Sequence, residues 1–165
     1  KKTNPGRMKS FSRDFKKLSG TVIVDSSAGL GQEATAAIEL ADELIVVTNP
    51  EMPAVTDALK AVKLAEQLKK PVRGVIVTRV RKDEIELEPE IVKEMLEIPI
   101  LGMVPEDMAV KKSIRNKGTV VHLYPKSNAA RAYKEIAAKI LGVPYDSDKD
   151  RENFFERFSA WLGFK

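Results

Sequence analysis

The sequence predicts an α/β fold in which helices cover both faces of a doubly wound, mostly parallel sheet. Short apolar runs alternate with helix-like segments along most of the 165 residues, a pattern typical of parallel strands joined by right-handed crossovers. The runs TVIVD and ELIVVTNP are continuously apolar rather than alternating, as expected for strands buried on both faces. Glycine and proline residues separate the segments, which favours short turns between regular elements.

Five segments are expected to form the strands of this sheet. Each is a short apolar run rich in β-branched residues, and several end at a turn signal such as Asn-Pro or Tyr-Pro. His122 lies in the last segment and is interpreted as a structural residue of the sheet rather than a catalyst. In chain order, the expected strands cover residues 21–25, 43–50, 74–80, 100–107 (with the turn that follows) and 119–124.

The segments between the expected strands carry helical signals. Apolar residues recur every three to four positions, Pro89 stands at a first helical position, and Gly142 follows the last helix. The same spacing in residues 1–20 predicts a further short amphipathic helix. The expected helices of the domain cover residues 32–42, 56–70, 90–96, 108–116 and 128–141.

The chain is expected to consist of one domain, a linker and a terminal helix. Residues 1–142 form the domain, residues 143–150 the linker, and residues 151–165 an amphipathic helix. In this helix, five large apolar side chains fall within an arc of roughly 120°. They are Phe154, Phe155, Phe158, Trp161 and Leu162. Such a stripe either packs back onto the domain or lies in the headgroup region of a membrane, and the membrane interpretation is favoured.

Composition limits the classes of function. The net charge of +4 permits contact with nucleic acid or anionic lipid, but the basic residues are spread along the chain, so nucleic-acid binding is disfavoured. The chain contains no cysteine, which excludes disulfides and thiolate metal sites within these residues and fits a reducing cytoplasm. No segment approaches the roughly 20 apolar residues of a membrane span. The first residue is lysine rather than methionine, which predicts a piece of a longer chain.

The turn after the first expected strand carries the candidate chemistry. Asp25 ends the strand, and Gly29 follows among small residues whose amides an anion can approach closely. In one interpretation Asp25 holds Mg²⁺, directly or through water, while the Gly29 amide approaches a terminal phosphate. In a second, GLGQEA is a dinucleotide fingerprint with Glu51 as the ribose-binding acid. In a third, Asp25 only caps the turn.

Several segments together resemble a known family. DSSAGL, ELIVVTNPEMPAVTDALK, GVIVTRV, ILGMVPEDMAVKKSIRNKG and VVHLYPKSNAARAY occur in this order, and they are similar to the carboxyl-terminal two thirds of the MinD/ParA-type P-loop ATPases, the MinD branch above all. The resemblance covers nearly all of residues 15–142. It implies a fold that binds ATP with Mg²⁺, forms an ATP-dependent homodimer, hydrolyses the nucleotide slowly and controls attachment to a membrane.

The resemblance also implies roles for single residues. Asp25 matches the family's acidic residue on the Mg²⁺ side, and Gly29 matches the glycine of its second switch region. The segment Asn49, Pro50 and Glu51 matches the part of the family near the dimer interface. Asp57 lies on the following helix, at a surface that family members use for regulatory protein partners.

Two further segments match the family's adenine site. Thr78 and Arg79 stand where the family usually has Asn-Arg against the base, and a loop that closes the other side of the base is matched by Pro105, Glu106 and Asp107. A threonine hydroxyl has a shorter reach than an asparagine amide, so base selectivity depends on how Thr78 is placed. Ser27 also departs from the family, which usually has proline there.

The sequence contains no G-x-x-x-x-G-K-[ST] motif, and this absence limits what these residues can do alone. The amides and the lysine that neutralise the β- and γ-phosphates are missing, so the segment alone is predicted to be inactive. The whole protein is expected to be a cytoplasmic ATPase, peripheral at the cytoplasmic face of the cell membrane, that regulates septum placement. The alternatives are a ParA-type or flagellar-number-type positioning ATPase, a dinucleotide-binding oxidoreductase and a non-catalytic adaptor. Iron–sulfur carriers are disfavoured because cysteine is absent.

Overall fold

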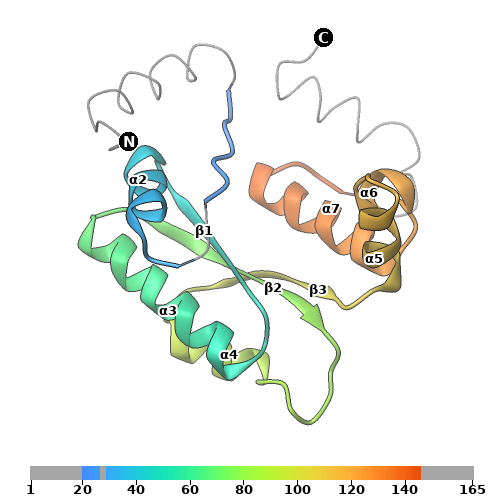
Figure 1. Cartoon of the computed structure of the whole chain (residues 1–165), viewed down its shortest axis with the longest axis horizontal. Helices are drawn as coiled ribbons and strands as arrows, with labels where there is room; N and C mark the ends of the chain where they lie inside the picture. Colours follow the sequence, from blue (N-terminus) through green and yellow to red (C-terminus); the bar gives the residue numbers. More distant parts are fainter. Residues whose placement is uncertain (1–19, 27–28, 146–165) are drawn as a thin grey trace.

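The computed structural model describes residues 20–26 and 29–145 (Figure 1). Its centre is a three-stranded parallel sheet in the order β1-β2-β3. The strands are β1 (Leu44–Thr48), β2 (Val72–Val80) and β3 (Ile100–Pro105). Because all three run in the same direction, their carboxyl ends meet at one rim of the sheet, and the loops that follow them lie side by side.

Six helices are described around this sheet. They are α2 (Gln32–Leu40), α3 (Met52–Gln67), α4 (Pro89–Leu96), α5 (Met108–Arg115), α6 (Val120–Leu123) and α7 (Asn128–Leu141). Pro89 occupies the first turn of α4, and Gly142 ends α7 in the left-handed region at φ 66°, as the sequence predicts. The helix after β1 begins at Met52 rather than at residue 56, because Pro53 fits the first turn and does not interrupt the helix.

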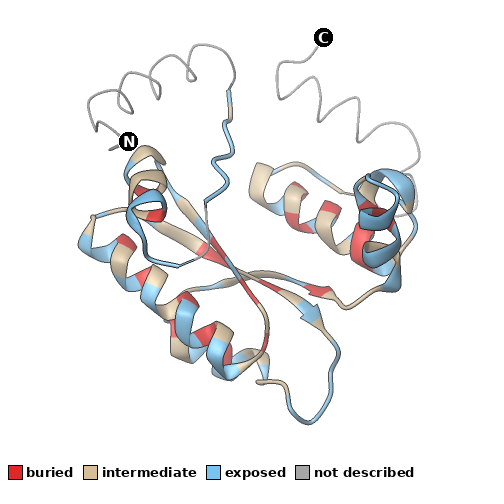
Figure 2. Ribbon diagram, in the orientation of Figure 1, coloured by how far each residue is buried: buried red, intermediate tan, exposed pale blue. Residues whose placement is uncertain are grey.

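The helices cover both faces of the sheet. On one face, α3 and α4 pack against β1 and β2 around a cluster of buried residues: Val46, Val55, Ala58, Val62, Val75, Val77, Val92 and Leu96. On the other face, α7 packs on β3, and the buried residues are Val104, Ala129 and Ile136 (Figure 2). The expected doubly wound α/β architecture is therefore confirmed in the described part of the chain.

The first expected strand is not formed. Residues 21–25 are extended but pair with none of the described strands, and the side chain of Ile23 is 83% exposed. The neighbouring sheet face over β1 is also open, since Val47 is 62% exposed. A strand is stable only when another strand satisfies its backbone groups, and among the described residues none is placed to do so.

The fifth expected strand is a helix. Residues 119–124 contain β-branched residues, yet the structure places α6 there, with the Thr119 side chain accepting a hydrogen bond from the His122 amide at 3.3 Å. The Tyr124 amide donates to the Val120 carbonyl at 2.8 Å and closes the turn. The segment packs between α5 and α7 and pairs with none of the described strands, so the Thr119 cap and these contacts determine its conformation rather than β propensity. His122 is an exposed residue of this helix, and the prediction that it lies in the sheet is wrong.

Some expectations concern residues outside the described ranges. These are the helix in residues 1–20, the Ser27 position, the last residues of the linker, and the terminal apolar stripe of Phe154, Phe155, Phe158, Trp161 and Leu162. Among the helices that are described, none is long and apolar enough to traverse a lipid bilayer.

Candidate functional site

The rim at the carboxyl ends of the strands brings together residues that are far apart in the sequence. The Thr78 hydroxyl near the end of β2 lies 3.2 Å from the Thr48 carbonyl and 3.4 Å from Asn49 Oδ1, both at the end of β1. The Glu106 amide, directly after β3, donates to the Val80 carbonyl at 2.9 Å. The loops after β1, β2 and β3 are therefore held together by hydrogen bonds at the position where open α/β sheets bind ligands.

Asp107 begins α5 and fixes the loop that follows β3. Its Oδ1 accepts a hydrogen bond from the Ala109 amide at 2.8 Å, and its Oδ2 accepts from the Ala129 amide at 3.2 Å. These backbone donors, Ala109 foremost, hold the pKa of Asp107 below its ordinary value because they stabilise the carboxylate. The segment Pro105, Glu106 and Asp107 is thus anchored at its last residue and leaves Glu106 partly exposed on the rim.

Glu106 lies between two cations. Lys111 Nζ is 3.0 Å from its Oε1, and Arg81 Nη1 is 3.9 Å from its Oε2. The hydrogen bond and charge of Lys111 are the main reason why the pKa of Glu106 is lowered, with smaller contributions from Arg79 and Arg81. The carboxylate is therefore ionised at neutral pH and can act only as a hydrogen-bond acceptor.

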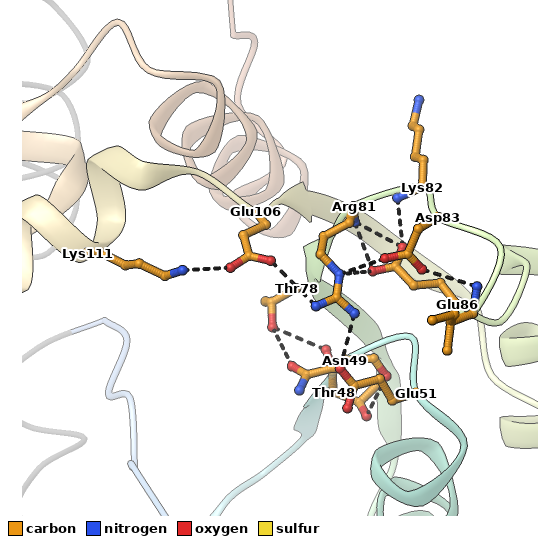
Figure 3. Close-up of polar contacts among 11 residues, drawn as sticks. Thr48, Asn49, Glu51, Thr78, Arg81, Lys82, Asp83, Glu86, Glu106 and Lys111 are labelled. Carbon is orange, nitrogen blue, oxygen red and sulfur yellow. Dashed lines mark hydrogen bonds and ion pairs between the residues drawn. The ribbon is translucent and has the colours of Figure 1, made fainter.

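Arg81 gathers acidic side chains from all three loops (Figure 3). Its guanidinium lies 3.0 Å from Asp83, 3.4 Å from Glu86, 3.6 Å from Glu51 and 3.9 Å from Glu106. These carboxylates, Asp83 foremost, raise the pKa of Arg81 above its already high value. The charged segment RKDEIELEPE, residues 81–90, is not among the site residues that the sequence predicts, so this cluster is found only in the structure. The only available signal was a basic residue followed within five positions by three acids.

Glu86 is the least exposed acid of the cluster. Its side chain is 5% exposed, and its carboxylate accepts hydrogen bonds from the Arg81 and Lys82 amides at 2.8–2.9 Å. Lys82 adopts a left-handed backbone conformation, with φ 61°. Glu86 thereby holds the start of the loop after β2 in a fixed turn.

The segment Asn49, Pro50 and Glu51 leads from β1 into α3. The Pro50 carbonyl accepts a hydrogen bond from the Leu87 amide at 2.8 Å, which ties this segment to the loop after β2. Glu51 is only partly exposed, and Asp57 is exposed on α3, where it pairs with Lys60 at 2.8 Å. Arg79 is exposed at the end of β2 with a left-handed φ of 59°.

Among the described residues, no hydrogen bond or ion pair joins Asp25 or Gly29 to this cluster. Both are exposed, and Gly29 has φ 89°, a conformation that favours glycine. In the described part of the chain, Asp25 makes no hydrogen bond or ion pair. No group of three His, Asp or Glu side chains in residues 20–26 and 29–145 could hold a metal ion. A single carboxylate suffices where phosphate oxygens and waters complete the Mg²⁺ coordination, so the proposed metal role of Asp25 fits its chemistry and stays a prediction.

The fold agrees with comparisons to known proteins. A family model described as 4Fe-4S iron sulfur cluster binding proteins, NifH/frxC family, matches residues 20–148. An uncharacterized ATP-binding protein of Methanocaldococcus jannaschii is 37% identical over 164 residues, which cover 98% of this chain and 62% of the relative. The septum site-determining protein MinD of Buchnera aphidicola is 35% identical over 150 residues, 82% of this chain and 55% of the relative.

A solved structure extends the comparison to the fold. The septum site-determining protein MinD of Pyrococcus horikoshii, complexed with Mg-ADP, has a TM-score of 0.76 and 26% identity over 83% of this chain and 56% of that one. This chain thus spans between 55% and 62% of the length of these proteins.

The iron–sulfur cluster in the family description does not fit these residues. Cysteine thiolates are the usual ligands of such clusters, and the chain contains no cysteine. The family match covers most of the chain, and the MinD proteins are similar to this chain in both sequence and fold. The chain therefore belongs to the NifH/frxC family, and its similarity in sequence and fold also assigns it to the MinD/ParA-type P-loop ATPases.

Proposed function

We propose that the whole protein is a MinD-like ATPase that binds MgATP at the rim of the sheet, dimerises with bound nucleotide and regulates the position of the division septum. The observation that carries this proposal is the rim itself. The loops after three parallel strands are tied together there and present Asn49, Thr78 and Glu106 on one side of the molecule (Figure 3). The similarity to a MinD protein complexed with Mg-ADP supports the nucleotide assignment.

The base is proposed to lie between the loops after β2 and β3. The hydrogen of the Thr78 hydroxyl is directed to the Thr48 carbonyl or to Asn49 Oδ1, which leaves a lone pair that can accept from the adenine amino group. Arg79 would flank the same side. The segment Pro105, Glu106 and Asp107 would close the other side, with its last residue anchored to α5 and α7.

The phosphates and Mg²⁺ are proposed to lie on the side of Asp25 and Gly29. Asp25 has an exposed carboxylate without a partner among the described residues, so it is available to a hydrated Mg²⁺ ion. Gly29 carries no side chain that would hinder the approach of a phosphate to its amide. When bound, the metal would neutralise developing charge on the γ-phosphate.

Two surfaces are proposed for protein contacts. The segment Asn49, Pro50 and Glu51 lies at the rim and would face the second subunit of the ATP-dependent homodimer. Asp57 lies further along α3, exposed, where a regulatory protein partner could reach it. The first surface leads directly into α3 and the second lies on α3, so a partner on α3 would contact residues next to the proposed dimer interface.

Membrane association is proposed to depend on the terminal apolar stripe. Phe154, Phe155, Phe158, Trp161 and Leu162 would insert into the headgroup region, each contributing about 1.5–3 kcal/mol before ordering costs. One copy would bind marginally and two copies in a dimer much better, because the second insertion is intramolecular. The whole protein would then lie at the cytoplasmic face of the cell membrane when it is dimeric.

Residues 1–165 alone are proposed to be inactive. No phosphate-binding lysine motif is present in the sequence, and the sheet is open at β1, where Ile45 is 37% and Val47 62% exposed. Further elements packed on this face would bury these side chains, and a strand added beside β1 would bring a phosphate loop to the same rim. The open face and the partial coverage of relatives support this interpretation.

Nucleotide binding by the whole protein tests the proposal. Titrations with MgATP and with NADH, followed by isothermal calorimetry, should give micromolar binding of MgATP and none of NADH. Tight NADH binding would favour the oxidoreductase instead. Residues 1–165 alone should show no micromolar binding of MgATP, and such binding would contradict the proposed need for the phosphate loop.

A further inference from the structure

One arginine at the rim contacts acids from the loops of all three strands. Arg81 Nη2 lies 3.6 Å from Glu51 Oε1, after β1, and Nη1 lies 3.9 Å from Glu106 Oε2, after β3. Its Nε lies 3.0 Å from Asp83 in its own loop. A single guanidinium thus lies between the segment that leads into α3 and the loop that leads into α5 (Figure 3).

The backbone around Arg81 is fixed by other groups. Glu86, which is nearly buried, accepts hydrogen bonds from the Arg81 amide at 2.9 Å. The loop is tied to Pro50 through the Leu87 amide, and Val80 accepts from the Glu106 amide at 2.9 Å. The backbone of Arg81 is therefore fixed, and Asp83 holds its guanidinium at 3.0 Å in the position from which it approaches Glu51 and Glu106.

Glu106 is held from two sides. Lys111 binds Oε1 at 3.0 Å, and Arg81 approaches Oε2. A carboxylate accepts hydrogen bonds and cannot donate them, so it suits the amino group of adenine and repels the carbonyl oxygen that guanine carries at the same place. This discrimination requires that the carboxylate keep one orientation, because an incorrectly placed acceptor favours neither base.

We propose that Arg81 is a positioning residue that orients the Glu106 carboxylate and thereby determines the preference of the rim for adenine over guanine nucleotides. The inference rests on the proposed function, since it requires a nucleotide at this rim. Without Arg81, Glu106 is held by Lys111 alone, on the exposed side, and can turn away from the base. Because Arg81 also contacts Glu51, the same side chain links the base loop to the segment proposed for the dimer interface.

Competition between ATP and GTP for the whole protein tests this inference. The variants are Arg81→Gln, Glu106→Gln and the double variant, with the dissociation constants of both Mg-nucleotides measured by displacement of a fluorescent ATP analogue. Arg81→Gln should reduce the ratio of GTP to ATP dissociation constants roughly tenfold, and Glu106→Gln should reduce it by a similar factor. The double variant should show no further reduction, because both changes remove the same oriented acceptor.

Controls separate positioning from folding. Arg73→Gln removes the ion pair of Arg73 with Glu43 near the opposite ends of the strands, at 3.0 Å, and its hydrogen bond to the Ile140 carbonyl, and should leave the ratio unchanged. Arg81→Lys keeps the charge and should restore part of the preference, which provides a readout if Arg81→Gln folds poorly. Equal weakening of ATP and GTP with a lowered melting temperature would indicate a structural role and overturn the inference.

The result also distinguishes this inference from the proposed function. If the wild-type protein prefers ATP and Arg81→Gln keeps the full preference, the inference is wrong and the proposed function stands. If the reductions of the single variants multiply in the double variant, Arg81 acts independently of Glu106, and the inference is equally wrong. If the wild-type protein binds neither nucleotide, the proposed function fails, and the inference fails with it.

Discussion

Asp107 and Ala129 are joined by a hydrogen bond between elements 22 positions apart in the sequence. The Asp107 carboxylate accepts from the Ala109 amide in its own helix and from the Ala129 amide in the first turn of α7, at 2.8 and 3.2 Å. One side chain therefore satisfies backbone donors at the amino ends of two helices. This relationship holds the loop after β3 against α7 and fixes one wall of the candidate site.

Replacement of this shared cap should destabilise the fold more than replacement of a single cap. In Asp107→Ala, one helix loses its cap and the fully buried Ala129 amide loses its partner, so we expect a loss of about 2 kcal/mol in the free energy of unfolding. Ser127→Ala removes only the cap of α7, a hydrogen bond of 3.2 Å to the Ala130 amide, and should cost about 1 kcal/mol. Urea unfolding of the whole protein measures both, and equal losses would show that the Ala129 bond contributes nothing.

The stabilisation by Asp107 should depend on pH. Its pKa is lower in the folded state than in the unfolded state, where it is about 4, so its contribution is complete above pH 4 and is lost as the pH falls through the folded value. Asp107→Asn keeps the shape without the charge and should be less stable than the wild type at pH 6. Urea unfolding at pH 6 and at pH 3 should show this difference shrinking. A difference that stays constant with pH would mean that the charge of Asp107 is not involved.

Gly102 in β3 should be intolerant of a side chain because α7 lies directly above it. A Cβ at this position would come within 2.7 Å of Ile136 Cδ1, so Gly102→Ala should cost about 1–3 kcal/mol. Gly31→Ala, with nothing within 4 Å of the added carbon, should cost less than about 1 kcal/mol. In the double variant with Gly102→Ala and Ile136→Ala, the loss in the free energy of unfolding should be smaller than the sum of the two single losses. Chemical denaturation measures these losses. If the two losses are strictly additive, the strain in Gly102→Ala does not come from contact with Ile136.

The order of elements from residue 32 to β3 and the stopping of α7 at Gly142 could be predicted from the sequence, because local signals there agree with the packing. TVIVD has the composition of a strand, but β pairing needs a neighbour, and none is described at that position. The prediction of a strand at TVVHLY was wrong because a capping threonine and short connections to α5 and α7 favour a turn of helix there.

The candidate site was predictable only in part. The resemblance to the MinD/ParA-type ATPases indicated Asn49, Thr78 and Glu106, and the structure ties together the loops that carry them. The central position of Arg81 depends on how a charged loop folds between two other loops, and no spacing in the sequence encodes that arrangement. Asp25 and Gly29 are not joined to this cluster among the described residues, so their roles stay predictions.

Membrane attachment should depend on the apolar stripe in residues 153–165. Deletion of these residues from the whole protein should abolish MgATP-dependent cosedimentation with vesicles that contain anionic lipid, because the inserted apolar area is lost. Trp161→Lys should weaken vesicle binding strongly, while Ser159→Lys, expected on the opposite face of the helix, should not. Binding that survives the deletion would rule out this segment as the anchor.

The rate of MgATP hydrolysis by the whole protein, wild type and Asp25→Asn, tests the central claim most directly. We expect slow hydrolysis by the wild type and a loss of roughly a hundredfold or more in Asp25→Asn, because the metal-side carboxylate is replaced by a neutral amide. Glu94→Gln, an exposed acid on α4, serves as the matched control and should hydrolyse ATP at the wild-type rate. A folded Asp25→Asn protein that hydrolyses MgATP as fast as the wild type would contradict the account.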